Sequence, residues 1–401
     1  MPKVELSVNP FLKGDKLMIY FDNAATTGKK PAEVINAVVT ALKGYSANPG
    51  RGGYKYSAKT ADAVFRVREK TAEFFCAEGP EKVVFTLNCT HSINAVLKGV
   101  LKKGDHIVVS SLEHNAVMRP LKKAGTSYTV VEVSLTDDET TVENFKRAIR
   151  PNTKMIFCTG GSNVLGRLLP IERIGELCKE KKLLFGVDAA QIAGVIPIDM
   201  KKMNIDYLCV AAHKGLYAPM GLGILICRKS IPETIIEGGT GTNSLDLTQP
   251  SELPERLESG TVNVPAIIGL GAGLNFIEKR GIKRLYSEEM KLIKAIYNGL
   301  AKNRNIELYT PLPEPWSYAP LLSFNFKGIE SNAVARLLDQ NNIAVRAGYH
   351  CAPSAHKQIG TLENGAVRVS VSAFNTFAEA DTFIKTVNDE NFFKILKKAI
   401  E

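Results

Sequence analysis

The chain has 401 residues, 45% of them hydrophobic and 23% charged, and its formal net charge is +10. This length and composition predict a folded protein of two domains and exclude a disordered chain. The longest apolar runs are only as long as single strands, which excludes a membrane-spanning helix. The first residues lack the pattern of a signal peptide, and the seven cysteines form no CxxC pair. We therefore expect a cytoplasmic protein with reduced thiols.

The positive charge is distributed along the whole chain. Its densest runs, at residues 179–182 and 397–398, are typical of solvated helix faces. We therefore expect no direct contact with nucleic acid. The excess charge instead suits the capture of an anionic cofactor, an amino-acid carboxylate or an acidic protein partner.

Short apolar runs alternate with amphipathic helical stretches over residues 82–227, a pattern typical of parallel strands joined by helical crossovers. We predict a large, mainly parallel α/β domain over residues 24–264. Its candidate strands are residues 83–86, 106–110, 155–159, 183–187, 207–211 and 223–227. Polar side chains follow several of these strands, at the edge where open α/β sheets bind ligands.

The pattern changes after Pro265, where a long helical stretch begins. We predict a smaller α+β domain over residues 265–401, and we assign residues 1–23 to the same domain. The candidate strands of the small domain are residues 306–309, 321–326, 344–346 and 366–371.

A turn at residues 86–92 joins the first candidate strand to a helix expected over residues 93–101. A helix N-terminus offers free amide hydrogens and the positive end of the helix dipole, which suits a phosphate group. Thr90 or Ser92 could equally cap the helix, and capping is compatible with phosphate binding.

Lys214 and Asp188 each follow or end a candidate strand. A lysine at a strand end is usually a solvated charge. Lys214, however, lies between a histidine and a glycine, a setting that suits a Schiff-base lysine, whose amine must be deprotonated and mobile. A carboxylate at the end of an apolar strand needs a cation, and the pyridinium nitrogen of pyridoxal 5′-phosphate (PLP) is one. Asp188 would also serve as a helix cap.

Ordered motifs cover essentially the whole chain, from residues 20–27 (YFDNAATT) through Arg368 to residues 374–376 (FNT). In these motifs the chain resembles the cysteine desulfurases, within the class V group of PLP enzymes that have the aspartate aminotransferase fold, or fold type I. Residues 346–352 (RAGYHCA) are most similar to the group II branch, which includes SUF-type desulfurases and selenocysteine lyases. The resemblance implies a PLP cofactor, L-cysteine as substrate, a homodimer and a sulfur-acceptor protein, with iron–sulfur cluster assembly as the associated process.

The resemblance also implies roles for individual residues. Lys214 would hold PLP and remove the α-proton of the substrate, His114 would stack on the pyridine ring and assist proton transfer, and Cys351 would take the sulfur. The implied cofactor-binding residues are Cys89, Thr90, His114, Asn163, Asp188, Gln191, His213, Lys214 and Thr261. Among them, Thr261 resembles the residue that reaches the phosphate of the neighbouring subunit. The implied substrate-binding residues are Asn163, Arg346 and Arg368, and the arginine at 368 would pair with the substrate carboxylate.

Three parts of the chain depart from the family's pattern. Ala211 stands where the family usually has serine or threonine, so one hydroxyl for the phosphate is missing. His91 stands where a glutamate is usual. The turn before it reads Cys89-Thr90, where the family usually has Thr-Thr or Ala-Thr. The cysteine loop continues through residues 353–361 with a sequence unlike that of the SUF-type enzymes, which affects the expected substrate or acceptor.

Cys351 lies in a loop punctuated by glycine and proline, where a thiol can be reached, whereas Cys209 and Cys227 lie in apolar runs typical of a core. A thiol with an ordinary pKa of about 8.5 is only partly ionised at neutral pH. We expect His350, Arg346 and His356 to help its ionisation. The same loop offers His350, Cys351 and His356 as metal ligands, but the absence of a clear fourth ligand argues against a metal site.

Three other functions stay open. A selenocysteine lyase or another PLP β-lyase would use the same lysine and depend less on Cys351. A class V aminotransferase fits the cofactor motifs but gives no reason for Cys351. A non-catalytic sulfur-transfer scaffold would have no need of Lys214, Asp188 and Arg368 together.

Overall fold

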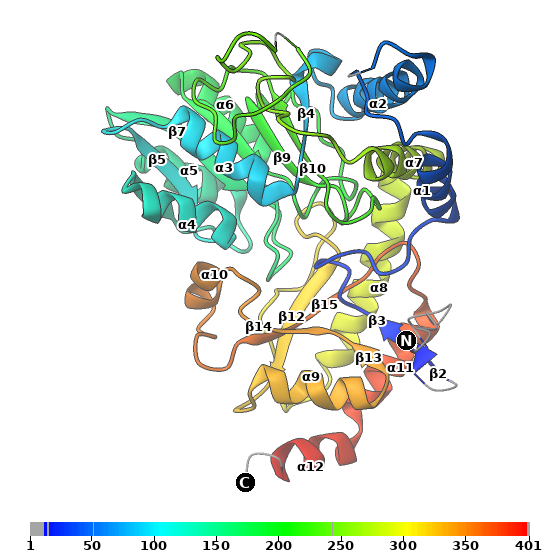
Figure 1. Ribbon diagram of the computed structural model, residues 1–401. Helices are drawn as coiled ribbons and strands as arrows, with labels where there is room; N and C mark the ends of the chain where they lie inside the picture. The colour runs from blue at the N-terminus through cyan, green and yellow to red at the C-terminus, as the bar shows by residue number, and fades with distance from the viewer. Residues whose placement is uncertain (1–11, 14–15, 51, 243, 399–401) are drawn as a thin grey trace.

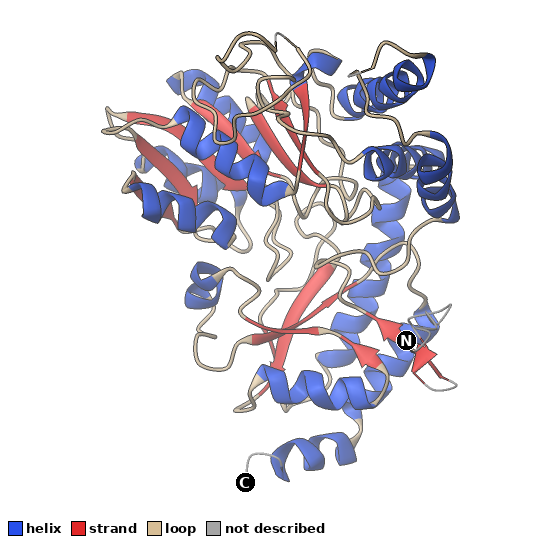
Figure 2. Ribbon diagram, in the orientation of Figure 1, coloured by secondary structure: helices blue, strands red, loops and turns tan. Residues whose placement is uncertain are grey.

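The computed structural model describes residues 12–13, 16–50, 52–242 and 244–398. Figure 1 shows two parts, one built on a seven-stranded sheet and one on a four-stranded sheet, and helix α8 (Ile282–Leu300) runs down into the second part. Figure 2 shows that helices flank the strands in both parts. The expected fold class is confirmed, whereas the boundaries of the domains stay a prediction.

The large sheet has the strand order β4-β10-β9-β8-β7-β5-β6. The five strands from β9 to β6 are parallel, and β10 pairs antiparallel with both β9 and β4. The strands are β4 (Val83–Thr86), β5 (His106–Ser110), β6 (Ser127–Val131), β7 (Thr153–Thr159), β8 (Leu184–Asp188), β9 (Tyr207–Ala211) and β10 (Gly223–Cys227). Because both faces of the sheet are covered, most of these strands are continuous apolar runs.

Alternate residues of the strands enter two different cores. Ile107 of β5 packs with helices α3 and α4, whereas its neighbour Val108 belongs to the core on the opposite face. The helices of this part are α1 (Ala32–Gly44), α2 (Lys55–Phe74), the 3₁₀ helix η1 (Pro80–Lys82), α3 (Cys89–Val100), α4 (Asn115–Ala124), α5 (Asp138–Arg147), α6 (Ile171–Lys181) and α7 (Val264–Arg280).

The small sheet is antiparallel, with the order β11-β12-β15-β14. A separate pair of short parallel strands brings the N-terminal segment to this part of the molecule, because β3 pairs with β13. The remaining strands are β1 (Leu12–Lys13), β2 (Lys16–Leu17), β3 (Ile19–Tyr20), β11 (Ile306–Leu308), β12 (Leu321–Phe326), β13 (Ile343–Ala344), β14 (Arg346–Gly348) and β15 (Ala366–Ser370). The helices, besides α8, are α9 (Ser331–Gln340), α10 (Pro353–Gln358), α11 (Phe377–Asn388) and α12 (Glu390–Lys398).

Five candidate strands have the bounds that the sequence predicts, and others shift by one or two residues at an end. The single strand expected at residues 344–346 is wrong: Ala344 ends β13, and Arg346 begins β14 in a different sheet. The helix expected over residues 93–101 begins at Cys89. Strand β6 was not expected, since it is an edge strand whose side chains are mostly exposed.

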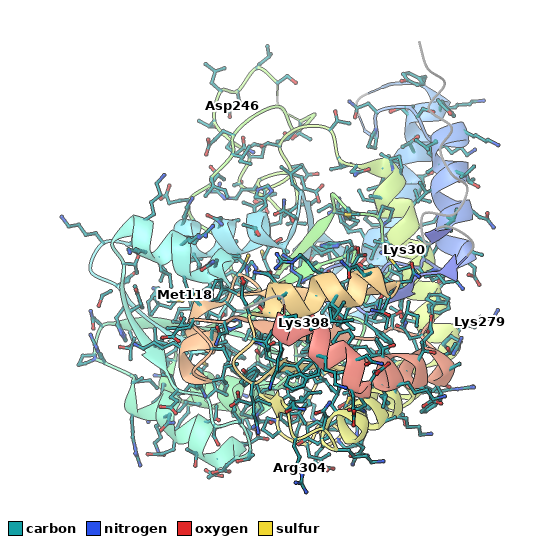
Figure 3. The ribbon with its side chains drawn as sticks, turned by 90° about the horizontal axis from the view of Figure 1, so that it is seen from below. Lys30, Met118, Asp246, Lys279, Arg304 and Lys398 are labelled. Carbon is teal, nitrogen blue, oxygen red and sulfur yellow. The ribbon has the colours of Figure 1, made fainter. Side chains whose placement is uncertain are left out.

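Within the described ranges, no helix is long and apolar enough to cross a membrane. All seven cysteines are free thiols, and Cys209 and Cys227 are fully buried as expected. Figure 3 shows Lys279, Arg304 and Lys398 well apart from one another.

Candidate active site

A cavity of about 130 Å³ lies at the carboxyl ends of the central parallel strands. Because β7, β8 and β9 run in the same direction, the residues that follow them meet at one edge of the sheet. The N-terminal end of helix α3 closes the cavity. It is lined by Asn88, Cys89, Thr90, Ile93, His114, Ala116, Thr159, Gly161, Asn163, Asp188, Ala190, Gln191, Ala211, His213 and Lys214.

The first wall of the cavity is the turn that opens helix α3. Asn88 caps this helix, because its side-chain oxygen accepts a hydrogen bond from the backbone amide of His91 at 2.9 Å. The expectation that Thr90 or Ser92 is the cap is therefore wrong. Ser92 is buried, with its hydroxyl 2.8 Å from that of Thr86, and Thr90 lies on the cavity wall. Capping by Asn88 leaves Thr90 available for a ligand.

Asp188 ends β8 and is 4% exposed. Its Oδ1 accepts hydrogen bonds from the amide of Ala190 at 2.9 Å and from the thiol of Cys89 at 3.5 Å. Burial, followed by the charge of Asp188, raises the pKa of Cys89 well above its usual range, so the thiol stays protonated and donates. Cys89 thus contacts the carboxylate that faces the cavity.

Lys214 lies on the turn after β9 and borders the same cavity. Burial lowers the pKa of Lys214, and the charge of Asp188 opposes this effect. A lowered pKa is what an amine needs to act as a nucleophile or a base near neutral pH. The turn is tied to the N-terminal segment, because Thr27 Oγ1 and Lys30 Nζ donate to the carbonyl of His213 at 3.1 and 2.9 Å.

The ring of His213 carries an unsatisfied polar atom. Its Nδ1 is buried without a hydrogen-bond partner in the part of the chain that the structure describes. Burial, together with Lys214 and Lys30, lowers the pKa of His213 to about 4, so the ring is neutral at pH 7. A buried polar atom without a partner is costly, and a bound group with hydrogen-bonding atoms would satisfy it. This nitrogen fits a phosphate-bearing cofactor in the cavity.

His114 caps helix α4 and faces the cavity. Its Nδ1 accepts a hydrogen bond from the amide of Ala116 at 3.0 Å, so that nitrogen carries no proton. Burial is the largest of several effects that lower the pKa of His114, and the resulting neutral ring is suited to stacking on an aromatic cofactor.

Glu113, for which the sequence predicted no role, directly precedes His114. It is fully buried, and its Oε1 accepts hydrogen bonds from the hydroxyl of Ser110 and from the amide of Thr159 at 2.8 Å. Burial raises the pKa of Glu113 to about 8, so the carboxyl group is mostly protonated at neutral pH. It joins the ends of β5 and β7 without adding a second negative charge beside Asp188. Its position directly before His114 was the one sign in the sequence that Glu113 belongs to the site.

Arg368 on β15 is 2% exposed. Its Nη1 donates to the carbonyl of Asn163 at 2.8 Å, and its Nη2 forms an ion pair with Asp22 Oδ1 at 2.7 Å. Arg346 lies opposite Arg368 in the register of β14 and β15, but it is exposed. Asp22 was also missed, although it belongs to the motif at residues 20–27. Asp22 holds the guanidinium in place, since an ion pair at this burial is strongly directional.

Cys351 is exposed and lines a second cavity, which shares Thr90, His114 and Ala116 with the first. The backbone at His350 and Cys351 is left-handed, with φ of 48° and 57°. Such a conformation is unfavourable for residues other than glycine and needs support. Two hydrogen bonds supply it: Asn163 Nδ2 donates to the carbonyl of His350 at 2.6 Å, and the amide of Asn115 donates to that of Cys351 at 2.7 Å.

The expectation that His350 and His356 help to ionise Cys351 is not supported. His350 is 5% exposed and His356 is fully buried. Burial lowers the pKa of His350 far below its ordinary value and that of His356 to about 4, so both rings are neutral at pH 7 and supply no positive charge. No cluster of metal-ligating side chains occurs among the described residues, this loop included.

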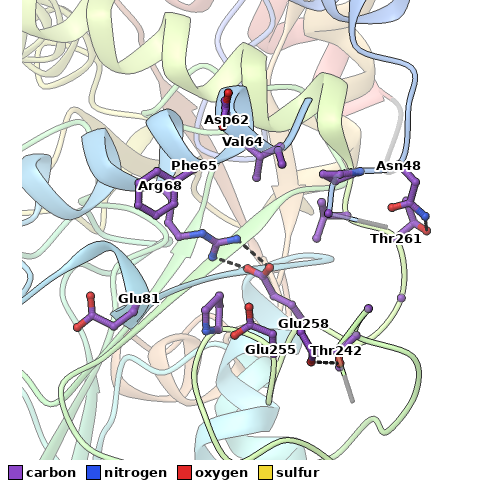
Figure 4. Close-up of a pocket in the computed structure, with 18 residues that line it drawn as sticks. Asn48, Asp62, Val64, Phe65, Arg68, Glu81, Thr242, Glu255, Glu258 and Thr261 are labelled. Atoms are coloured by element: carbon purple, nitrogen blue, oxygen red, sulfur yellow. Dashed lines mark hydrogen bonds and ion pairs between the residues drawn. The ribbon is translucent and has the colours of Figure 1, made fainter. Parts of the chain in front are cut away.

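Thr261 lies apart from the other predicted site residues. It borders a separate pocket of about 390 Å³, where Arg68 and Glu258 form a buried ion pair at 2.7 Å (Figure 4). Asn48 Nδ2 donates to the hydroxyl of Thr261 at 3.3 Å. The chain therefore does not bring Thr261 to its own cavity, and the role expected of it in a neighbouring subunit stays a prediction.

The family model Aminotransferase class-V matches residues 19–383. The chain is 34% identical to a probable cysteine desulfurase of Pyrococcus abyssi, over 93% of this chain and 94% of that one. It is 32% identical to a probable cysteine desulfurase of Synechocystis, with 92% and 90% covered. The apo structure of cysteine desulfurase from Thermococcus onnurineus NA1 matches with a TM-score of 0.86 at 32% identity, over 95% of each chain. The chain therefore belongs to the class V aminotransferase family, among relatives named as cysteine desulfurases.

Proposed function

We propose that this protein is a PLP-dependent cysteine desulfurase, which converts L-cysteine to L-alanine and leaves the sulfur as a persulfide on Cys351. One observation carries the proposal. The cavity that holds Lys214 and Asp188 shares part of its wall with the cavity that holds the exposed Cys351. An amine of lowered pKa, a buried carboxylate and an accessible thiol thus converge, which is the set of groups that this reaction requires.

The residues around the first cavity fit PLP. Asp188 would face the pyridine nitrogen, His114 would stack on the ring, and Gln191 would lie beside it, since all three border the cavity. His213 and Thr90 would contact the phosphate, next to the N-terminus of α3. When bound, PLP supplies an electron sink for the α-carbon of an amino acid.

Lys214 moves the proton in this proposal. Its lowered pKa favours the unprotonated amine, and that amine takes the α-proton of the substrate. The neighbouring His114 is neutral and does not compete for the charge of Asp188. The same ammonium then returns a proton to the carbon fragment as alanine forms.

Arg368 orients the substrate through its carboxylate, while Asp22 and the carbonyl of Asn163 fix the guanidinium. The Cys351 thiolate attacks the sulfur of L-cysteine. The sulfur–sulfur bond forms as the carbon–sulfur bond breaks, and the electron pair of the broken bond stays with the carbon fragment. An acceptor protein then collects the sulfur, and the exposure of Cys351 is consistent with that transfer.

We also propose a homodimer in which Thr261 contacts the phosphate bound by the other subunit. Helix α1 presents the exposed apolar side chains of Ile35, Val39 and Leu42, which a second copy would cover. The division into a large domain at residues 24–264, a small domain at 265–401 and an N-terminal segment at 1–23, a cytoplasmic location and a role in iron–sulfur cluster assembly belong to the same proposal. Residues 1–11 and 14–15 of that segment lie outside the described residues.

The deciding experiment is mass spectrometry of the holoenzyme after treatment with L-cysteine. One added sulfur atom should appear on the peptide that contains Cys351 and disappear on reduction. Cys76→Ala, which removes a partly buried thiol that borders neither of the two cavities, should behave like the wild type. Release of alanine without sulfur on Cys351 would instead indicate a lyase, and the absence of both would exclude the proposed reaction.

A further inference from the structure

The second cavity, which Cys351 borders, has a volume of about 310 Å³ and extends along helices α3 and α4. The two helices pack side by side through one shared apolar core (Figure 1). Residues four apart lie on one face of a helix, so each helix presents one row of side chains to the cavity. These rows include Thr90, Asn94 and Lys98 on α3, and Asn115, Arg119 and Lys123 on α4.

Three of the lining residues are cations, and no described lining residue is an anion. Lys98, Arg119 and Lys123 are exposed. Within the part of the chain that the structure describes, none of the three side chains forms an ion pair or a hydrogen bond with another residue. Neither α3 nor α4 contains an aspartate or a glutamate. The cavity beside Cys351 therefore has three positive charges that no lining carboxylate offsets.

Cations near the end of a helix can also serve the helix itself. Lys98 and Lys123 lie in the last turns of α3 and α4, where positive charge offsets the helix dipole. Arg119 lies in the middle of α4, so this explanation does not cover it. Burial lowers the pKa of His114 most, and the charge of Arg119 adds to that effect. The positive charge of the cavity thus extends to the side where Cys351 and His114 lie.

The position of the cations relative to Cys351 follows from the geometry of α4. The amide of Asn115, the first residue of α4, donates to the carbonyl of Cys351 at 2.7 Å. Arg119 and Lys123 follow Asn115 by one and two helical turns, which places them about 6 and 12 Å further along the axis. An extended peptide advances about 3.3 Å per residue, and its alternate side chains share a face. Carboxylates about two and four residues from a cysteine in such a peptide match this spacing.

We propose that the second cavity docks an acidic, extended segment of the sulfur-acceptor protein, in which carboxylates lie two and four residues from the cysteine that receives the sulfur. This inference rests on the proposed function, since it names the partner that collects the persulfide. The acceptor thiolate attacks the outer sulfur of the persulfide on Cys351. A new sulfur–sulfur bond forms as the old one breaks, and Cys351 leaves as a thiolate. Sulfur moves between two thiols without net oxidation, so no further reactant is needed.

The lining also favours a peptide over a nucleic acid. Proteins that bind single-stranded nucleic acid usually combine basic side chains with aromatic side chains on which the bases stack. No phenylalanine, tyrosine or tryptophan is among the described residues that line the second cavity. The cavity therefore offers charge without a stacking platform, which suits carboxylates on a peptide.

The transfer test uses the holoenzyme and two synthetic peptides with one cysteine each. One peptide has glutamate at the second and fourth positions after the cysteine, and the other has lysine there. At about 50 mM salt, sulfur should pass to the glutamate peptide about tenfold faster, and at about 0.5 M salt the difference should fall to within about twofold because salt screens exposed charges. A nearby lysine favours the peptide thiolate, so the intrinsic reactivity of the peptides opposes the expected preference. Equal rates at low salt would overturn the proposal.

Two neighbouring residues of α4 provide a matched pair of variants. Lys123→Glu reverses a charge that borders the cavity, whereas Lys122→Glu makes the same change at an exposed residue that does not border it. Transfer to the glutamate peptide should slow about three- to tenfold in Lys123→Glu and stay within about twofold in Lys122→Glu. Alanine formation with dithiothreitol, a neutral thiol, should be unchanged in both. A loss of that activity in Lys123→Glu would assign the residue to catalysis and overturn the docking role.

A reaction without turnover keeps the inference separate from the proposed function. Each peptide is converted to its mixed disulfide with thiopyridine, and absorbance follows the release of thiopyridone as Cys351 attacks. Mass spectrometry identifies the cysteine that has reacted. The glutamate peptide should again react about tenfold faster at low salt, with the same dependence on Lys123 and not on Lys122.

The outcomes of the two experiments can be told apart. If the wild type forms no alanine but Cys351 keeps the preference for the glutamate peptide, the proposed function fails and the docking surface stands. If the wild type forms alanine and Cys351 shows no preference, the docking surface fails and the proposed function stands. Protection of Cys351 by a short single-stranded RNA, with no preference between the peptides, would also overturn the proposal and indicate a nucleic-acid partner.

Discussion

The cofactor cavity and the cysteine loop are built in different ways. Asp188 and the turn of Lys214 are held by the ends of buried parallel strands, whose backbones are hydrogen-bonded on both sides. Cys351 lies on a left-handed turn that a few side-chain and backbone contacts hold, and its thiol is exposed. The comparison teaches that groups which must keep a fixed geometry are on the sheet, whereas the group that a partner protein must reach is on a loop.

The largest effect on activity should come from a substitution in the cofactor cavity. Lys214→Ala removes the amine that carries the proton, so we expect kcat for alanine formation to fall by at least about 10³-fold. The characteristic cofactor absorbance should change as well. Lys202→Ala, at a lysine whose side chain is 66% exposed, should leave both unchanged. Normal absorbance and activity in Lys214→Ala would show that this cavity is not the cofactor site.

Substitution in the cysteine loop should have a selective effect instead. Cys351→Ala should stop alanine release from L-cysteine, because no thiolate takes the sulfur, but it should keep the cavity and its absorbance intact. The measurement is alanine release from L-cysteine and from L-selenocysteine, whose selenium leaves more readily. Loss of only the cysteine activity supports the desulfurase, and retention of both activities would contradict the persulfide mechanism.

The same contrast explains what the sequence could predict. Strands β4, β5, β9 and β10 have the predicted bounds because each is a short apolar run between turn residues. The polar residues at their carboxyl ends were recognised because parallel topology brings such residues together. Asp188, Lys214 and His114 therefore meet in one cavity, as expected.

The contacts within the cysteine loop could not be predicted from the sequence pattern in the same way. Residues 343–345 (IAV) form a single apolar run, and only the tertiary structure shows that the chain changes sheets just after it. His350 and His356 looked like available bases because sequence gives their type but not their burial. The roles of Asp22 and Glu113 were not predicted for a related reason, since they depend on partners far away in the sequence.

Low pH should lower the stability of the folded protein, because the buried histidines of the cysteine loop are neutral. The folded pKa of His356 is about 4 because the ring is buried, against an ordinary value of 6.5. Between these values the unfolded chain binds a proton that the folded chain does not, so the free energy of unfolding falls as pH falls. His356→Gln should reduce that fall between pH 7 and pH 4.5 by about 2 kcal/mol, as measured by urea unfolding. Parallel pH profiles of the variant and the wild type would show that His356 is protonated in the folded state.

The smallest expected effect is a tighter binding of PLP in the cavity. Ala211 ends β9, is 4% exposed and borders the cavity, at the position where a hydroxyl is usual in the family. Ala211→Ser should therefore tighten PLP binding by about three- to tenfold, which corresponds to one net hydrogen bond of about 1 kcal/mol. Titration of the apoprotein with PLP measures this change.

The apoprotein of Ala211→Ser should also unfold at a slightly lower temperature, because without PLP the new hydroxyl is buried with no assured partner. The holoenzyme should recover that loss. A weaker affinity for PLP together with a less stable apoprotein would mean that the phosphate does not lie beside residue 211. One added hydroxyl can raise the affinity for PLP only where the backbone already fixes the position of the side chain. The end of β9 fixes residue 211 in this way. A comparable single substitution in the cysteine loop has no such fixed frame, because the left-handed turn depends on the contacts that surround it.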